Sequence, residues 1–276
     1  MTTWSWMISV YLWLAGMAGG AYFAAFLAER LKAVSKEARL LKAATWLGVP
    51  AVLLGSLLLT LELGQPGRFW HLFGEFRTLS PMSIGSWLLL MWGLVGSAML
   101  VLWLLKRADR VVEVLSWVAF VLSVLLITYT GVLLSATNQP LWSKTLMLPA
   151  LFVVTSISRG IAFLTVTVLM SKRRSVHTLS VLGRSDVTLY VLDLVALGAF
   201  LIALGPTRKV ITSGTLGFFL WVGVLIMGIL VPLGTGVRAM VRDNEGGAAT
   251  LLAALWAIAG GLILRDVIVL GGQIYG

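Results

Sequence analysis

Three side chains that could hold and protonate a small organic molecule lie near the ends of long apolar runs. Tyr11 and Tyr129 each supply a phenol, and Glu62 supplies a carboxylate. A phenol can donate a hydrogen bond to a carbonyl oxygen, and a nearby titratable group can pass protons to water, which is what a quinone pocket needs. The alternative is that all three mark the membrane interface, with the tyrosines in an aromatic belt and Glu62 reaching for water.

A second group of ionisable side chains lies inside the apolar runs. Arg159 is in the middle of its run, and Asp193 is the only acid well inside the run from 187 to 204. A charge within a bilayer is costly and is a functional candidate by default. An ion pair between Arg159 and Asp193 is the structural interpretation, and a proton path is the functional one. Arg265 and Asp266 point about 100° apart on a helix, so at least one of them is expected to face a neighbouring helix.

Histidine and cysteine, the usual ligands of haem and of iron–sulfur clusters, are missing from the apolar runs. The protein has no cysteine, and both histidines, His71 and His177, lie outside these runs. A b-type haem needs axial ligands inside the membrane helices, usually histidine, and an iron–sulfur cluster needs cysteine. We therefore expect no haem, no iron–sulfur cluster and no metal in this chain. Any redox chemistry would use an organic carrier dissolved in the bilayer.

The elements that must position these side chains are eight apolar runs. Hydrophobic residues make up 59% of the 276 residues and the mean hydropathy is +0.98, far outside the range of soluble domains. A spanning helix needs about 20 apolar residues, whereas a β-barrel would show short alternating segments. The sequence predicts an all-α integral membrane protein with eight transmembrane helices, over residues 6–28, 44–63, 83–105, 111–136, 145–170, 187–204, 214–240 and 248–272.

The net charge of +10 has its origin in the connections between the runs. Fourteen lysines and arginines fall on one side of the membrane and five on the other. Basic residues accumulate in cytoplasmic loops, so both termini are expected on the non-cytoplasmic face of a bacterial or archaeal cytoplasmic (inner) membrane. The same rule explains the charge without nucleic acid as a partner. In this orientation Tyr11, Glu62 and Tyr129 share the outer leaflet.

A faint internal repeat divides the sequence. Residues 63–66 (LGQP) are echoed by 204–206 (LGP), and residues 84–88 (IGSWL) by 216–220 (LGFFL). We therefore expect two four-helix bundles, one over residues 1–140 with the quinone site and one over residues 141–276. The connection from 63 to 82 carries His71 among many aromatic residues, and is either an interfacial belt or a docking platform for a peripheral subunit.

Five stretches resemble motifs of the membrane subunits of the NrfD/polysulfide reductase family. They are residues 14–20 (LAGMAGG), 61–69 (LELGQPGRF), 80–87 (SPMSIGSW), 129–136 (YTGVLLSA) and 260–265 (GGLILR), which together span almost the whole chain. Three positions depart from the pattern. Glu62 stands where the family usually has Asp, and Ile8 and Tyr11 stand where a better-known member has Asn and His. Because Tyr does not titrate near neutral pH, Glu62 or His71 is expected to handle the proton.

The resemblance implies eight spans in two four-helix bundles, no haem, and oxidation or reduction of menaquinone or ubiquinone near the outer face. It also implies a ferredoxin-like four-cluster iron–sulfur partner, usually with a molybdopterin catalytic subunit. The family's site tyrosine corresponds to Tyr129 and its span-5 arginine to Arg159. The residues expected to act are Tyr129 and Glu62 as catalytic groups, Tyr11, Gly16, Gly20, His71 and Tyr129 as cofactor-binding groups, and Arg159 and Asp193 as a proton path.

Residues and resemblance together favour a haem-free membrane anchor subunit of a respiratory oxidoreductase complex. Such a subunit exchanges electrons and protons between membrane quinone and an external iron–sulfur subunit. The alternative is a secondary transporter or a proton-translocating membrane protein, because repeats and midplane charges suit that class. Co-purification with a cluster-bearing subunit would favour the anchor, and solute movement by the lone protein in liposomes would favour the transporter.

Overall fold

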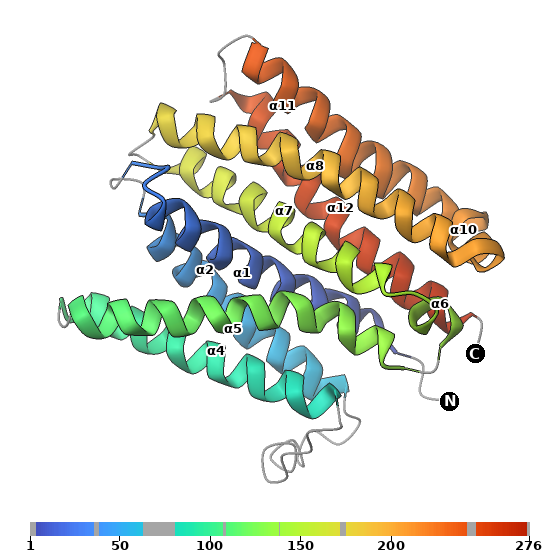
Figure 1. The fold of residues 1–276 in the computed structure, drawn as a ribbon, viewed down its shortest axis with the longest axis horizontal. Helices are drawn as coiled ribbons and strands as arrows, with labels where there is room; N and C mark the ends of the chain where they lie inside the picture. The colour runs from blue at the N-terminus through green and yellow to red at the C-terminus, as the bar shows by residue number, and fades with distance from the viewer. Residues whose placement is uncertain are drawn as a thin grey trace.

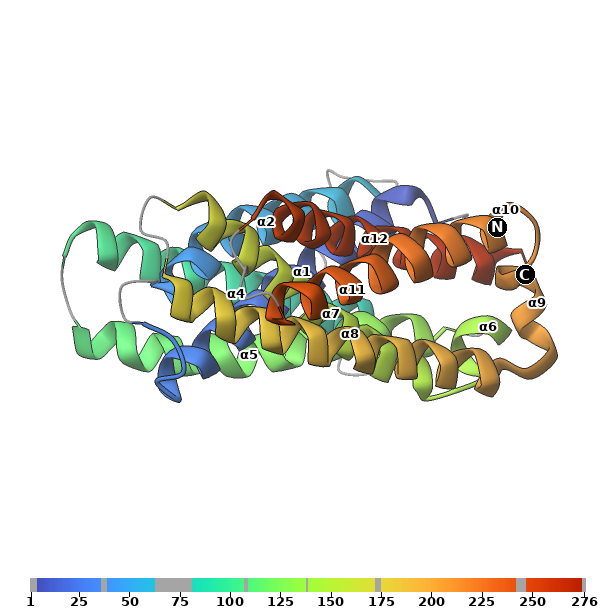
Figure 2. The same ribbon diagram turned by 90° about the horizontal axis from the view of Figure 1, so that it is seen from above.

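The computed structural model describes residues 4–35, 39–62, 81–106, 109–137, 139–171, 175–241 and 247–274. Throughout these ranges the regular structure is helical, without a strand, and eight helices are long and apolar enough to cross a membrane. This confirms the predicted all-α integral membrane fold with eight spans. The spans run roughly along one direction, and α1 begins at the end of the array where α12 ends (Figure 1, Figure 2).

The first four spans are α1 (Trp6–Arg30), α2 (Leu40–Glu62), α4 (Pro81–Leu104) and α5 (Asp109–Ser135). Local signals explain where three of them start. The Ser5 hydroxyl caps α1 by accepting a hydrogen bond from the backbone N–H of Met7 (3.2 Å). Pro81 is the first residue of α4, a position at which its missing N–H breaks no helical hydrogen bond. The Glu29 carboxylate accepts a hydrogen bond from the N–H of Leu41 (2.8 Å) and so fixes the start of α2.

The last four spans are α7 (Met147–Met170), α8 (Val176–Leu204), a composite of three helices, and α12 (Ala248–Gln273). The composite span consists of α10 (Gly214–Phe218), the π-helix η4 (Phe219–Leu230) and α11 (Val231–Val241). Short helices α6 (Pro140–Ser143), η3 (Gly205–Arg208) and α9 (Lys209–Thr212) lie in the connections. The apolar run predicts the composite span but not its change of helix type, which widens the helix locally.

The start of α8 differs from the prediction. It begins at Val176 rather than at residue 187, and the Ser175 hydroxyl caps it by accepting from the N–H of Thr178 (3.3 Å). The charges at Arg184 and Asp186 interrupt the apolar run, yet both residues belong to the helix. The structure therefore adds a second acid, Asp186, to the span that carries Asp193.

The helices α1 and α7 lie side by side in the middle of the array, with α4 and α5 on one flank and α8 and α11 on the other (Figure 1). Glycines permit this close approach. A Cβ atom on Gly20 would overlap the carbonyl oxygen of Ser156, and one on Gly160 would overlap the backbone nitrogen of Ala21. These contacts join the two halves of the sequence, and the division into two four-helix bundles stays a prediction.

Candidate functional site

Tyr129 of α5 is buried, and its position depends on a glycine. A Cβ atom on Gly85 of α4 would overlap the hydroxyl oxygen of Tyr129, so the phenol occupies the space that any larger residue would fill. Gly85 belongs to the stretch 80–87 that the sequence singles out, but the sequence does not pair it with Tyr129. The contact explains why a glycine is needed in that stretch.

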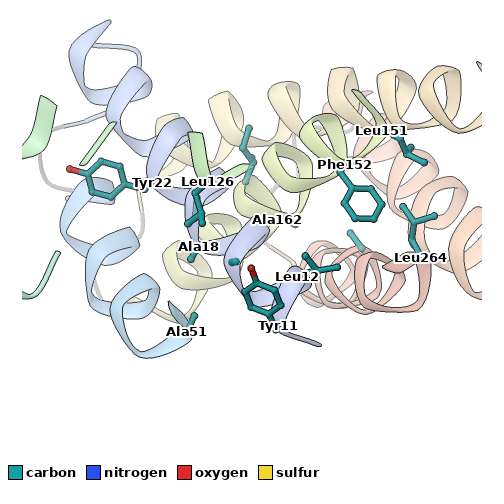
Figure 3. Close-up of a cluster of buried hydrophobic side chains, with 14 of the residues drawn as sticks. Tyr11, Leu12, Ala18, Tyr22, Ala51, Leu126, Leu151, Phe152, Ala162 and Leu264 are labelled. Carbon is teal, nitrogen blue, oxygen red and sulfur yellow. The ribbon is translucent and has the colours of Figure 1, made fainter. Parts of the chain in front are cut away.

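Tyr11 of α1 is fully buried and lies within interaction distance of Tyr129. Its ring lies against Gly55 of α2, whose added Cβ would be 3.5 Å from ring atom Cδ2. Figure 3 shows the phenol among buried side chains such as Leu12 of its own helix. The phenols of Tyr11 and Tyr129 lie close enough to interact, yet neither hydroxyl completes a hydrogen bond within the described ranges. Buried hydroxyls without partners are costly, so the pair marks a place for a polar ligand atom or water.

A cavity of about 290 Å³ lies between α2 and α4. Ser86 lines it and directly follows Gly85, so the cavity reaches the turn of α4 against which Tyr129 packs. The hydroxyls of Ser56 and Ser86 donate to carbonyl oxygens of their own helices, at 2.8 and 3.0 Å. Their polarity is therefore already satisfied, and the cavity offers a mainly apolar surface.

The outer wall of this cavity faces the surroundings of the helix array. The wall is formed by three leucines that are each more than half exposed: Leu53, Leu57 and Leu94. In a spanning segment such side chains contact lipid. Gly93 and Ser97, a pair whose spacing is typical of close helix packing, also line the cavity. Two of its lining residues, Ser56 and Ser86, directly follow Gly55 and Gly85, the glycines against which the two phenols pack. An apolar groove that opens toward lipid suits a lipid-soluble molecule.

Glu62 lies at the last residue of α2, close to the start of α1. Its two carboxylate oxygens accept hydrogen bonds from the backbone N–H of Ser5 (2.8 Å) and from the Ser5 hydroxyl (2.5 Å). At 1.5 Å per residue, Tyr11 is about 9 Å further along α1 than Ser5. Glu62 thus ties two helix ends together near the phenols without touching them.

Gly16 and Gly20 lie where α1 meets α7. A Cβ on Gly16 would be 2.5 Å from the Ser156 hydroxyl and 2.8 Å from atom Nη2 of Arg265. The Arg265 guanidinium is fully buried, donates to the Ser156 hydroxyl (2.9 Å) and lies over the ring of Phe152. The expectation that Arg265 or Asp266 faces a neighbouring helix is confirmed for Arg265. The glycines leave room for this guanidinium, and a contact between them and a cofactor stays a prediction.

Arg159 and Asp193 form a fully buried ion pair. Atom Nη1 of Arg159 lies 2.5 Å from Oδ2 of Asp193 and 2.8 Å from the Ser158 hydroxyl. Atoms Nε and Nη2 of Arg159 and Oδ1 of Asp193 have no hydrogen-bond partner in the part of the protein that the structure describes. Gly261 of α12 makes room, because its Cβ would lie 2.7 Å from Cγ of Arg159. The pair is only partly satisfied, which is expensive inside a membrane.

Asp186 is a buried acid that the sequence does not single out, because a charge at its position predicts the end of an apolar run. Its Oδ2 accepts a hydrogen bond from the Thr165 hydroxyl (3.1 Å), and its Oδ1 has no partner within the described ranges. A small cavity of about 30 Å³ adjoins it, with Tyr190 and Thr235 among the lining residues. This volume is enough for a water molecule. Asp186 lies two helical turns from Asp193 on α8, on the same side.

His71 and the aromatic connection from 63 to 80 lie outside the described residues, so the roles predicted for them stay predictions. The described part of the protein divides the remaining predicted residues into two buried groups. Tyr11 and Tyr129 come together near Glu62, and Arg159 pairs with Asp193 further into the second half. Gly16 lies between the groups, in contact with α7.

The eight spans and the two buried groups define a polytopic α-helical membrane protein that holds ionisable side chains inside the bilayer. The family model described as Polysulphide reductase, NrfD matches residues 1–275. This protein belongs to that family, as its motifs predict.

Three relatives match this protein along nearly their whole length. Protein NrfD of Escherichia coli strain K12 is 30% identical, over 98% of this sequence and 95% of that protein. Protein NrfD homolog of Haemophilus influenzae is 28% identical, over 98% and 94%. The C subunit of polysulfide reductase from Wolinella succinogenes is 27% identical, over 99% and 95%. The similarity therefore covers both halves of the sequence and both buried groups.

Proposed function

We propose that this protein is the haem-free membrane subunit of a respiratory oxidoreductase and that menaquinone or ubiquinone binds against Tyr11 and Tyr129. The observation that carries the proposal is the pair of buried phenols, which lack hydrogen-bond partners in the described ranges. They pack against Gly55 and Gly85, and the residues that follow these glycines line a lipid-facing groove. The full-length similarity to a polysulfide reductase subunit supports a place in a reductase complex.

The residues present fit a quinone. Its two carbonyl oxygens need hydrogen-bond donors, and each buried phenol has an O–H to give. When bound, the quinone supplies two-electron, two-proton redox chemistry. Tyr129 donates to one carbonyl oxygen, Gly85 leaves room for that phenol, and the groove between α2 and α4 takes the apolar tail.

Glu62 carries protons between this pocket and the water outside. It lies at the end of α2 on the same end of the array as the phenols, and its contact with Ser5 holds it there. Tyr11 fixes the phenol pair but is not the titrating group at neutral pH. Protons therefore pass through Glu62, with His71 of the adjoining connection as a second proton carrier.

The second buried group extends the proposal to a proton path. Arg159, Asp193 and Asp186 follow one another along the interior of the second half, and the small cavity beside Asp186 can hold water. These groups are also the observation that favours the alternative class, a proton-translocating or transport protein. Movement of solute in liposomes by the protein alone would support that alternative.

Electrons pass between the quinone and a partner at the end of the array where α1 begins. We propose a ferredoxin-like four-cluster iron–sulfur subunit there, together with a molybdopterin catalytic subunit, on the outside of the cytoplasmic membrane. The phenols and Glu62 lie toward that end, and the sequence predicts that side of the membrane to carry 5 basic residues against 14 on the cytoplasmic side. Purification of the intact assembly tests this partner directly, through its iron and molybdenum content.

Two substitutions test the quinone site. Tyr129→Phe removes one neutral hydrogen bond, worth about 0.5–1.5 kcal/mol, and should weaken quinone binding about tenfold. Turnover should fall further, because the same donor stabilises charge that develops during the reaction. Glu62→Gln keeps an acceptor for Ser5 but cannot titrate, so it should slow turnover in a pH-dependent way with little change in quinone affinity.

The measurement is quinone-linked turnover divided by the amount of assembled complex. A purely structural role predicts less assembled protein with normal activity per molecule. Wild-type turnover per assembled complex in both variants would remove the phenol pocket from consideration.

A further inference from the structure

A second large cavity lies at the end of the array opposite to the two phenols. Its volume is about 660 Å³, and it is enclosed by the last turn of α1, the first turn of α2, the end of α4 and the start of α5. Figure 1 shows that the ends of α4 and α5 diverge here from those of α1 and α2. The volume is in the range of small-molecule sites, so the cavity can hold a lipid headgroup.

The rim of this cavity carries more positive than negative charge. Four cations, Arg30, Lys32, Arg39 and Lys42, face two carboxylates, Glu29 and Glu113. Both carboxylates are engaged: Glu113 pairs with Arg30 at 3.0 Å, and Glu29 accepts from a backbone N–H of α2 at 2.8 Å. Within the described ranges, Lys32, Arg39 and Lys42 have no carboxylate at ion-pair distance. Among the described residues, these three cations are therefore available to an anion.

The inner wall of the cavity is apolar and aromatic. Phe26 is buried one turn deeper in α1 than Arg30, and Trp103 and Val112 line the sides formed by α4 and α5. The Lys42 ammonium lies 5.8 Å from the centre of the Trp103 ring, and the Arg30 guanidinium lies 5.2 Å from that of Phe26. The cations thus sit above aromatic rings at the edge of the membrane.

Exposed apolar side chains continue from this wall onto the lipid-facing surface. Leu104 at the end of α4 and Val114 near the start of α5 are each more than 60% exposed, and Trp117 is half exposed. A soluble anion would gain nothing from this surface, whereas an amphiphile with two acyl tails can cover it. The positive charge at the rim and the adjoining apolar surface therefore fit an anionic lipid better than a soluble anion.

We infer that this cavity binds the headgroup of an anionic phospholipid from the leaflet opposite the termini. The phosphate lies among Lys32, Arg39 and Lys42, and the acyl tails run along α4 and α5. Basic pockets between transmembrane helices on this side of a membrane bind such headgroups. The bound lipid fills the space between the diverging helix ends and joins α1 and α2 to α4 and α5. This site is independent of the quinone pocket, which lies at the other end of the helices.

Native mass spectrometry of the purified full-length protein tests the site, with three probes added in turn. The probes are dioleoyl phosphatidylglycerol, dioleoyl phosphatidylcholine and inorganic phosphate. The cavity variant combines Lys32→Gln, Arg39→Gln and Lys42→Gln. A matched control combines Arg110→Gln, Arg184→Gln and Arg238→Gln, which removes three exposed cations from the same end of the helices but outside the cavity.

The wild type and the control should retain phosphatidylglycerol at least about tenfold more strongly than phosphatidylcholine, and millimolar phosphate should not displace it. The cavity variant should lose this preference. If that variant fails to fold, the single substitution Lys42→Gln tests the site instead. It should lower the preference for phosphatidylglycerol over phosphatidylcholine about fivefold. Equal retention of the two lipids by the wild type, equal loss in both triple variants, or displacement by inorganic phosphate would each overturn the inference.

Discussion

At the scale of single residues, the shape of the candidate site depends on glycines as much as on the phenols and charged side chains. Tyr129 fits only because position 85 has no Cβ, Tyr11 rests against Gly55, and the buried Arg265 guanidinium fits beside Gly16. Each glycine therefore has a definite partner across a helix interface. Substitution of one of these glycines should displace the side chain that packs against it, while leaving that side chain in the protein.

Gly85→Ala should displace the Tyr129 phenol, because the new Cβ would overlap its hydroxyl oxygen. We expect quinone-linked turnover per assembled complex to fall at least tenfold, with a loss of about 1–3 kcal/mol in stability from overpacking. Gly198→Ala is the matched control, since its Cβ meets nothing within 4 Å, and should leave both quantities nearly unchanged. Normal turnover in the Gly85 variant would show that the position of Tyr129 is not important for activity.

The sequence predicts the reactive residues of this site but not its geometry. The direction of each span places Tyr11, Glu62 and Tyr129 in one leaflet. The pairing of Gly85 with Tyr129 depends on how each helix is rotated about its axis. Helices that are apolar on all sides, as in α4, have no polar face that would reveal this rotation. Asp186 escapes prediction for another reason, since a charge beside an apolar run indicates the end of a span rather than its interior.

The buried pair of Arg159 and Asp193 allows structure and function to be separated. Arg159→Met alone leaves Asp193 buried and unpaired, and should cost about 3–5 kcal/mol of stability. Adding Asp193→Leu should restore most of that stability, as thermal unfolding in detergent can show. If the pair belongs to a proton path, the stable double variant should still be deficient in quinone-linked proton uptake. Wild-type proton uptake by the double variant would leave the pair with a structural role only.

At the scale of helices, the groove between α2 and α4 is the element that we propose for the apolar tail of the quinone. Both helices present small residues there, and their serine hydroxyls are turned back onto their own carbonyl oxygens. The cap at Ser175 and the π-helical segment η4 show what an apolar run leaves undetermined. A run locates a span, whereas the start of α8 is set by a polar capping residue that lies outside the run, and the run carries no signal for the π-helical type of η4.

Gly93→Leu should fill this groove without disturbing the backbone, because the added Cβ has no contact closer than 3.9 Å. We expect the KM for a long-tailed quinol to rise about tenfold, the equivalent of about 1.4 kcal/mol of binding. Activity with a short-tailed analogue should be unchanged. Gly234→Leu, with open space around its Cβ, is the control. An equal effect on long and short quinols would show that the tail does not use the groove.

At the scale of the whole molecule, α1 contains residues of the first buried group and also packs against α7, the helix that carries Arg159. It carries Tyr11 against Gly55 of α2, and it carries Gly16 against α7 and the Arg265 guanidinium. Composition and charge asymmetry predict eight spans and place the phenols and Glu62 in one leaflet. They do not show that α1 and α7 pack closely through Gly20 and Gly160, because that contact depends on the fit of backbone atoms.

Photolabelling of the assembled protein with an azido-quinone, followed by peptide mapping, tests the central claim most directly. We predict labels on α1, α2, α4 or α5 within a turn of Tyr11, Gly55, Gly85 or Tyr129. Excess unlabelled quinone should abolish them, and Tyr129→Phe should reduce them. Competable labels confined to α7, α8 and α12 around Arg159 and Asp193 would contradict the account and place the quinone site in the second half of the protein.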